Sequence, residues 1–193
     1  MIVNNFKQVE QFLQPITEND FWFGQIIKRK KDNPDMSRSE RIIKSYNIKD
    51  YEHLIYFQEE IQSLCDYNNA RFYLNLNVRD LKLCHIRLIQ ALMTNIAQDT
   101  YSAIYSKVDS VLGSTMTPGR TKYWIADIDE KDYNLVNELK DAIDNCNGKE
   151  STVFETLNGF HIICEPFNRK EIVFKEIKIN SPTLIYFNKN ENN

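Results

Sequence analysis

Apolar and polar residues alternate along several short segments of the chain, as expected for β-strands that bury one face. The longest alternation runs from Arg71 to Arg79, where every second residue is apolar. Residues 21–31 and 41–48 are rich in aromatic and β-branched side chains, which predicts a hairpin. Further strands are predicted over residues 123–129, 151–156, 159–165, 175–180 and 183–188.

A second pattern repeats apolar residues every three or four positions, which is typical of helices with one buried stripe. Within residues 132–146 this stripe consists of Leu135, Val136, Leu139 and Ile143. Asp132 is placed to cap the start of that helix. Other helices are predicted over residues 4–14, 50–65, 81–97 and 101–112. Because helices and strands are interspersed, the pattern indicates an α+β fold with a mixed or antiparallel sheet.

The chain has 193 residues, of which 42% are hydrophobic, so it is long and apolar enough for one domain with a substantial core. Loops are predicted near residues 31–40, 113–122 and 148, where Asn, Ser, Pro or Gly cluster. We therefore expect a single domain over residues 1–193. Its parts would be an N-terminal hairpin and helical part (1–70), a core (71–188) and a frayed tail (189–193).

Charge and cysteine content narrow the class of protein. The 24 Lys and Arg residues against 27 Asp and Glu give a net charge of -3, which excludes a basic nucleic-acid coat and leaves only local patches for polyanions. The four cysteines form no CxxC pair, so neither a disulfide framework nor a cysteine zinc site is expected. The N-terminus lacks the pattern of a signal peptide, and no apolar stretch has the length of a membrane span. We therefore expect a soluble cytoplasmic protein with no membrane partner.

The polar faces of the predicted strands carry an unusual choice of residues. An antiparallel sheet with one solvated face explains the alternation, but such faces usually carry Thr, Lys, Glu and Ser. Here Asp127 and Asp129 share one polar face, and His161 and Glu165 share another. The remaining polar faces consist of Arg71, Tyr73, Asn75, Asn77 and Arg79 in one strand and of Glu176, Lys178 and Asn180 in a later one.

Asp127 and Asp129 are candidate metal ligands. Aspartate is a poor strand former, and side chains at i and i+2 lie roughly 7 Å apart along a strand, so the two charges repel each other. A divalent cation between them relieves this repulsion, and carboxylate oxygen atoms favour Mg²⁺ or Mn²⁺. A solvated or capping role is the alternative, since Asp129 is also placed to end the strand.

His161 and several basic residues complete the candidate site. A lone histidine in a strand is often structural, but its position on a polar face in register with the aspartates favours a functional role. Basic residues cluster at 28–31 and also flank the polar strand and the aspartate motif, as Arg71, Arg79, Arg120 and Lys122. With aromatic residues such as Tyr73 among them, they suit the phosphates of a nucleotide or nucleic acid. A basic loop and core aromatics would explain the same residues without a ligand.

Two of these segments resemble motifs of the archaeo-eukaryotic primase superfamily. Trp124-Ile125-Ala126-Asp127-Ile128-Asp129 is similar to the first motif, in which two aspartates follow three hydrophobic residues. Asn158-Gly159-Phe160-His161-Ile162-Ile163, which follows a predicted helix, is similar to the second motif, in which a histidine follows a small residue by two positions. ARFYLNLNVRD and RKKDNP resemble segments of small primase-like proteins of phages and mobile elements, so the resemblance covers most of the chain.

The resemblance implies an RRM-like catalytic sheet over residues 71–188, with helices packed on one face and an open polar face. It also implies that Asp127 and Asp129 bind two Mg²⁺ or Mn²⁺ ions and that His161 contacts the phosphates of the incoming nucleotide. Catalysis would be two-metal phosphoryl transfer from nucleoside triphosphates on a single-stranded DNA template, with a helicase or replication protein as a partner. Residues expected to contact nucleotide or nucleic acid are Arg71, Tyr73, Arg79, Arg120, Lys122 and Lys178.

The chain departs from the family pattern at one position. Members usually carry a third acidic ligand on a later strand, where this chain has Asn180, a neutral and weaker ligand. Glu165 would then have to compensate. An inactive primase-like module that binds single-stranded nucleic acid or a replication partner is therefore the alternative function. A regulatory or interaction protein that kept only the scaffold is a third.

Overall fold

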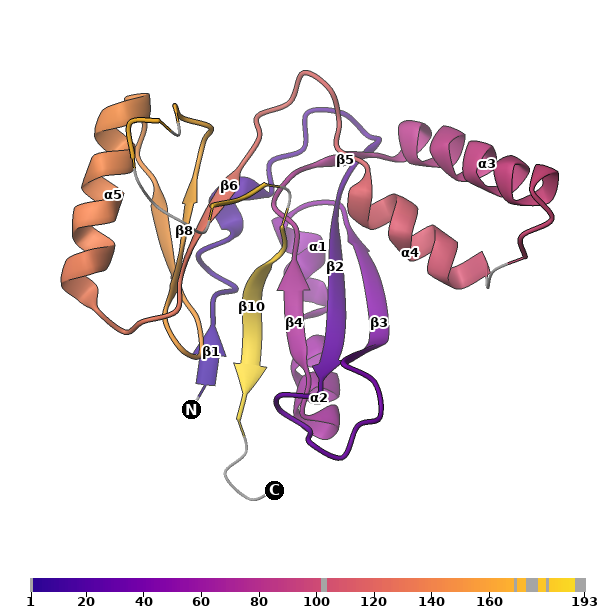
Figure 1. Ribbon diagram of the computed structural model, residues 1–193, viewed down its shortest axis with the longest axis horizontal. Helices are drawn as coiled ribbons and strands as arrows, with labels where there is room; N and C mark the ends of the chain where they lie inside the picture. The colour runs from indigo at the N-terminus through magenta and orange to yellow at the C-terminus, as the bar shows by residue number, and fades with distance from the viewer. Residues whose placement is uncertain (1, 102–103, 169, 173–176, 180, 190–193) are drawn as a thin grey trace.

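The computed structural model describes residues 2–101, 104–168, 170–172, 177–179 and 181–189. Within them the chain forms two antiparallel sheets that stand side by side, with helices against the sheets and a two-helix arm at one end (Figure 1). The fold is therefore α+β with antiparallel sheets, as the sequence predicts, and it is consistent with an RRM-like architecture. The strands that were expected to form one sheet form two.

The first sheet has the strand order β1–β10–β4–β2–β3, and β5 pairs with one end of β2. The first and last strands of the described chain lie side by side in it, because β1 (Ile2–Asn4) pairs with β10 (Thr183–Asn188). At its centre β4 (Arg71–Leu74) pairs with β2 (Asp20–Arg29). The predicted hairpin is confirmed, since β3 (Glu40–Ile48) pairs with β2 over most of its length.

Two helices, α1 (Tyr51–Tyr56) and α2 (Gln58–Asn68), pack on the first sheet and bury Leu54 and Ile61. The ring of Phe72 on β4 lies at the centre of this core and is fully buried. It packs directly over β2, where a Cβ atom at position 24 would lie 2.8 Å from the ring. Gly24 is therefore needed for this ring to approach the strand.

The second sheet has the order β7–β8–β6–β9. Its strands are β7 (Thr152–Glu155), β8 (Phe160–Cys164), β6 (Trp124–Ile128) and β9 (Ile177–Ile179). Helix α5 (Tyr133–Asn147) covers one face, where Val136, Leu139 and Ile143 meet apolar residues of β6 and β8. The predicted cap is confirmed, because the side chain of Asp132 accepts hydrogen bonds from the backbone N–H groups of Asn134 and Leu135.

The other face of the second sheet turns toward the first sheet. Ile125, Phe154 and Ile163 from this face belong to the same buried cluster as Phe72. The side-chain amide of Asn5 joins the two sheets, because it donates to the carbonyl of Glu155 at 2.8 Å and to that of Leu184 at 2.9 Å. The polar face that the sequence predicts is therefore part of a contact between two sheets.

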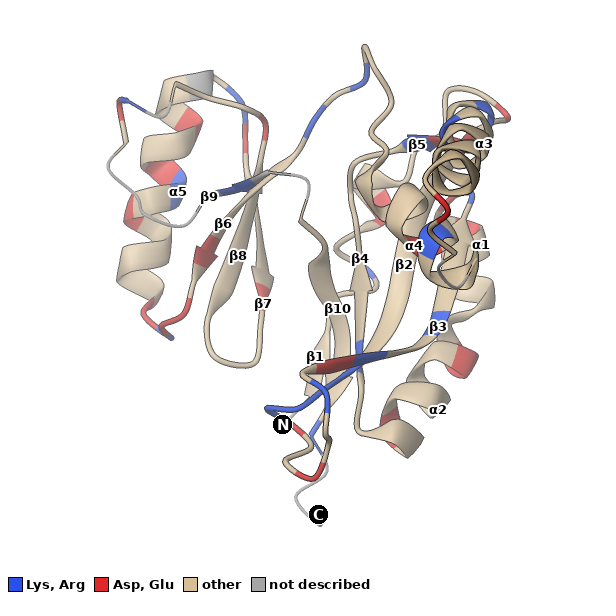
Figure 2. Cartoon of the chain, turned by 45° about the vertical axis from the view of Figure 1, so that its right-hand side comes forward, with Lys and Arg blue, Asp and Glu red and all other residues tan. Residues whose placement is uncertain are grey.

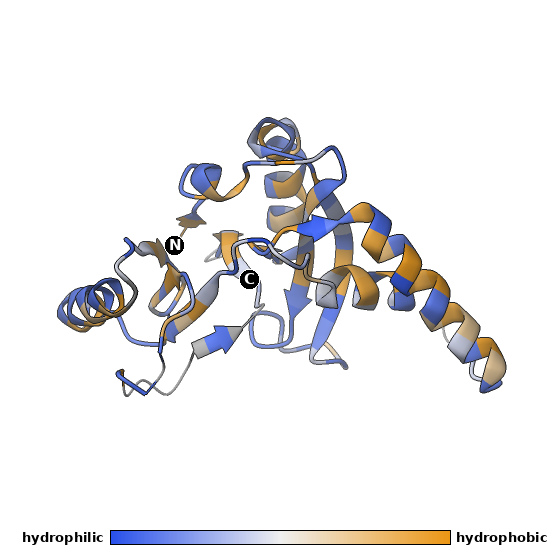
Figure 3. Cartoon of the chain, turned by 90° about the horizontal axis from the view of Figure 1, so that it is seen from above, coloured by the Kyte–Doolittle hydropathy of each residue, from blue (hydrophilic) through white to orange (hydrophobic). Residues whose placement is uncertain are grey.

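The two-helix arm consists of α3 (Leu81–Ala97) and α4 (Ile104–Ser114). It leaves the first sheet at β5 (Arg79–Asp80) and extends away from both sheets, as the view from above shows (Figure 3). Asp80 caps α3 by accepting a hydrogen bond from the N–H group of Leu83 at 2.7 Å. Both helices lie where the apolar periodicity predicts them.

Some expected elements differ from those observed. The helix expected over residues 4–14 is only β1, turns and a short 3-10 helix (Glu10–Phe12), because this segment supplies an edge strand and core residues to the first sheet. The strand expected over 71–79 is interrupted after Leu74. Strands β4 and β10, from the expected core, share the first sheet with β2 and β3 of the expected N-terminal part.

The structure also shows the state of the four cysteines and the character of the described helices. Cys65, Cys84 and Cys164 are buried free thiols, and Cys146 is a half-buried one. Among the residues that the structure describes, no helix has both the length and the apolar character that crossing a membrane requires.

Candidate functional site

A cleft of about 280 Å³ lies between the two sheets and contains most of the predicted site residues. The second sheet contributes Asp127, Asp129, His161 and Lys178. Figure 2 shows acidic positions on β6 and basic positions on the neighbouring strand β9. The facing wall, from the first sheet and its hairpin, consists of Arg29, Lys31, Glu40, Arg71 and Tyr73. Four of these side chains are cationic and three are acidic, so oppositely charged groups meet across one small space.

Asp127 is held by two partners on the neighbouring strands. Its Oδ1 atom lies 3.2 Å from Nε2 of His161, which sits directly opposite on β8, and its Oδ2 atom accepts a hydrogen bond from Lys178 on β9. The hydrogen bond from His161, together with that from Lys178, lowers the pKa of Asp127 to about 2. The carboxylate is therefore fully ionised at neutral pH, as a metal ligand must be.

His161 spans the two sheets. Besides its contact with Asp127, its Nδ1 atom lies 2.8 Å from Oγ1 of Thr183, a fully buried residue at the start of β10. Contacts at both ring nitrogen atoms fix the orientation of the imidazole at the edge of the cleft. Thr183 is a site residue that sequence analysis missed, because a threonine at the start of a strand is common and carries no signal by itself.

Gly159 allows the pairing of β6 with β8 in which His161 lies opposite Asp127. A Cβ atom at position 159 would lie 1.8 Å from the carbonyl oxygen of Ile128, so any larger residue would force the start of β8 away from the end of β6. The turn before β8 is closed by Thr156, whose N–H group donates to the carbonyl of Gly159 at 2.9 Å and whose Oγ1 accepts from the Gly159 N–H group at 3.1 Å. The small residue of the predicted second motif therefore places His161 opposite Asp127.

Asp129 lies one residue beyond the end of β6 and is exposed at the cleft. Its charge acts on Lys31 from the facing wall. Asp127 and Asp129 are both oxygen donors of the kind that Mg²⁺ and Mn²⁺ prefer. However, the described part of the chain contains no group of three or more His, Cys, Asp or Glu residues placed to hold a metal ion. Asn180, the residue at the position of the third ligand, lies outside the described residues, as does Glu176.

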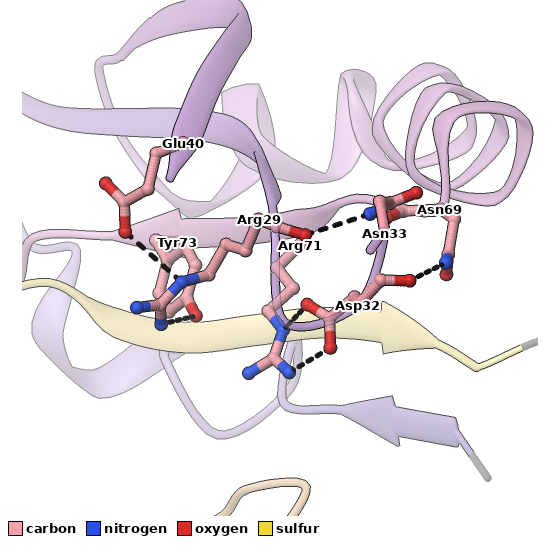
Figure 4. A network of polar contacts seen from close by, with 7 residues as sticks. All are labelled: Arg29, Asp32, Asn33, Glu40, Asn69, Arg71 and Tyr73. Carbon is pink, nitrogen blue, oxygen red and sulfur yellow. Dashed lines mark hydrogen bonds and ion pairs between the residues drawn. The ribbon is translucent and has the colours of Figure 1, made fainter. Parts of the chain in front are cut away.

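The facing wall is a network of paired charges (Figure 4). Arg71 makes a bidentate ion pair with Asp32, with N–O distances of 2.6 and 2.7 Å, and its guanidinium stacks 4.8 Å from the centre of the Phe187 ring. Arg29 lies 3.2 Å from both Glu40 and the hydroxyl of Tyr73. These arginines are therefore held in place before any ligand arrives.

In contrast to these paired arginines, Lys31 lies in surroundings that disfavour its positive charge. Burial and the nearby charges of Arg71 and Arg29 lower its pKa, although Asp32 and Asp129 act against this effect. An additional anion in the cleft would relieve the repulsion among these three cations. The sequence shows the basic segment at 28–31, but its approach to the aspartates depends on the contact between the sheets.

Four other expected site residues lie elsewhere. The prediction for Arg79 is wrong, because this side chain is fully buried and donates to the carbonyls of Leu112 and Gly113 at the base of the arm. Burial lowers its pKa to about 10. The three others do not line the cleft: Arg120 pairs with the buried Asp20, Lys122 is exposed, and Glu165 pairs with Lys149 at 2.6 Å.

Comparison with protein-family models, curated proteins and solved structures found no match to this chain.

Proposed function

We propose that the protein is a metal-dependent nucleotidyltransferase of the primase–polymerase type, which uses nucleoside triphosphates and a single-stranded DNA template. The supporting observation is that one cleft contains Asp127, Asp129 and His161 opposite Arg29 and Lys31. Facing carboxylates and cations suit a metal–triphosphate complex, because carboxylate oxygens bind the metal and cations bind the phosphates. The setting would be the replication of a phage or mobile element in a bacterial cytoplasm, with a helicase or another replication protein as partner.

Each residue has a distinct role in this proposal. Asp127 and Asp129 would hold Mg²⁺ or Mn²⁺, which would supply activation of the attacking hydroxyl and neutralise charge that develops in phosphoryl transfer. Lys178 must release Asp127 to make room for the metal, and its ammonium group then becomes a contact for phosphate. His161 keeps Asp127 oriented and presents its ring edge to the same ligand. Arg29 and Lys31 bind phosphates from the facing wall.

The size of the cleft limits what it binds. A volume of about 280 Å³ is close to the lower end of the roughly 300–1,000 Å³ that is usual for small-molecule sites. It therefore suits one nucleotide, and the template strand would lie along the rim.

The test is an assay for dinucleotide synthesis and primer extension with Mg²⁺ or Mn²⁺ on single-stranded templates. We expect product with the wild type and a loss of at least about 100-fold with Asp127→Asn and with Asp129→Asn, because each removes a charged ligand. Asp141→Asn is the matched control, since Asp141 is exposed on α5 and does not line the cleft. Absence of product with the wild type, or equal product from the site variants, would refute the proposal.

A second candidate function is a non-catalytic module that binds single-stranded nucleic acid or a replication partner. The ion pair between Lys178 and Asp127 favours it, because the ammonium group places a fixed positive charge where the first candidate needs a metal ion. In that case oligonucleotides would bind in a salt-sensitive manner, and nucleotide incorporation would be absent. Lack of binding at low salt would exclude this second candidate.

A further inference from the structure

The outer face of the arm carries a stripe of exposed apolar side chains on α3. Their exposed fractions are 45%, 58%, 64% and 65% for Ile86, Ile89, Met93 and Ile96, respectively. Successive spacings of three, four and three residues put all four on one side of the helix. A different side of α3 faces α4, where Cys84 and Leu88 lie close to Val108 and Leu112.

A helix that is apolar on two sides is normally covered on both. The arm extends away from the two sheets, and apolar segments recur between polar ones along it (Figure 3). Tyr105, near the start of α4, is 87% exposed. Single apolar residues are common on protein surfaces, but a continuous stripe marks a contact with another molecule.

We propose that this stripe is a homodimer interface in which α3 pairs in antiparallel orientation with α3 of a second copy. The spacing supports a second copy because it is symmetric about position 91. Ile89 and Met93 lie two residues to either side of that position, and Ile86 and Ile96 lie five residues to either side. In a two-fold contact, residue i meets residue j and residue j meets residue i. Ile89 therefore meets Met93 of the partner subunit, and Ile86 meets Ile96 of the partner subunit.

The charges on α3 support the same orientation. Residues 81–98 contain no Asp or Glu, and their cations, Lys82 and Arg87, lie in the first half of the helix. Lys82 lies on the stripe itself, four residues before Ile86. Antiparallel pairing places it at the end of the partner's helix, where carbonyl groups carry partial negative charge and Asp99 follows. Parallel pairing would instead bring the two Lys82 side chains together.

The dimer is expected to be reversible. A helix of 17 residues is about 25 Å long, and one such pair is smaller than a standard interface of roughly 800 Å² per partner. Interfaces below the standard size are usually transient, so we expect a dissociation constant on the order of tens of micromolar. The arm lies beyond β3, on the far side of the first sheet from the second sheet, so the cleft stays open in the dimer (Figure 1).

Sedimentation equilibrium between about 1 and 500 µM tests the contact. The wild type should show a monomer–dimer equilibrium, and the double variant Ile89→Glu/Met93→Glu should raise the dissociation constant at least 100-fold. Tyr67→Glu is the matched control, because Tyr67 is an 89% exposed residue of another helix, α2, and it should dimerise like the wild type. A wild type that stays monomeric throughout would overturn the proposal and assign the stripe to a different partner.

Cross-linking tests the orientation without a disruptive substitution. Ile86→Cys and Ile96→Cys proteins, mixed in equal amounts with a short thiol-specific bifunctional reagent, should give a covalent dimer. Neither variant alone should do so above the wild-type background, which accounts for the half-buried Cys146. Cross-linking of each variant with itself would show parallel pairing, and cross-linking of neither the mixture nor the single variants would place the contact elsewhere. Both results overturn the antiparallel model.

Discussion

The ion pair between Arg71 and Asp32 offers a sharp test of how the cleft wall is held. The side chains are 5% and 8% exposed, and two hydrogen bonds join them. Although burial acts to lower the pKa of Arg71, the hydrogen bond and charge of Asp32 raise it, so the guanidinium stays charged. Asp32→Asn would leave this charge buried without its counter-ion.

The expected cost follows from the burial of the pair. Removing one partner of a buried ion pair costs about 3–5 kcal/mol, a large share of the 5–15 kcal/mol that usually stabilises a domain. Replacing both partners with apolar residues, as in Asp32→Leu/Arg71→Met, should cost less than Asp32→Asn alone, because no unpaired charge remains. The double variant also loses the stacking of Arg71 on Phe187, so we expect it to remain less stable than the wild type.

Urea unfolding followed by circular dichroism measures the free energy of unfolding of the wild type and of each variant. Asp35→Asn is the control, since Asp35 is an exposed residue of the same loop. We also expect Asp32→Asn to bind inorganic triphosphate more tightly than the wild type, because the Asp32 carboxylate then no longer competes with the phosphates for Arg71. A cost no larger than that of Asp35→Asn would refute the reasoning about burial. Weaker triphosphate binding would refute the expectation that Arg71 contacts the phosphates of a nucleotide.

Three further predictions concern the second sheet and its contact with the first. Because the folded pKa of Asp127, about 2, lies below its ordinary value of 3.8, its ionisation should contribute about 2 kcal/mol above pH 4. That contribution should be lost as the pH falls toward 2, so Asp127→Asn should flatten the fall in unfolding free energy between pH 5 and 2. Gly159→Ala should cost at least about 3 kcal/mol, whereas Gly113→Ala, with its nearest neighbour 3.7 Å away, should cost nothing measurable by the same urea titration. Thr183→Val should destabilise the protein by about 1–2 kcal/mol and lower kcat in the primer-extension assay. Thr183→Ser, which keeps the hydroxyl that contacts His161, should restore both.

Sequence analysis predicted the fold class well because the two side-chain periods are local. Residues 132–146 show one clear stripe and an N-terminal cap, and α5 forms there. The N-terminal segment was misread because its apolar residues satisfy a helical spacing while their partners lie in β10 and in the core of the first sheet. Tertiary contacts therefore override a weak local pattern at the start of the chain.

The candidate site was partly predictable because the alternation of side chains along a strand is also a local property. Asp127 and His161 alternate with core residues, and they lie opposite each other in the structure. Arg79 was assigned to the same kind of face because the alternation continues through it, but regular pairing stops after Leu74. Beyond that point Asn77 binds the backbone of Tyr123, and Arg79 turns into the base of the arm.

The amino-acid sequence by itself determined which side chains share a face of a strand or helix, because that depends only on the geometry of neighbouring residues. It thereby determined that Asp127 and Asp129 share one polar strand face, that His161 lies on another, and that apolar residues form stripes along the helices of the arm. Only the tertiary structure decided that the strands divide into two sheets, that Arg71 lines the cleft and that the buried Thr183 contacts His161. Those outcomes depend on pairing between segments far apart in the chain, such as β4 with β10, which no local period encodes.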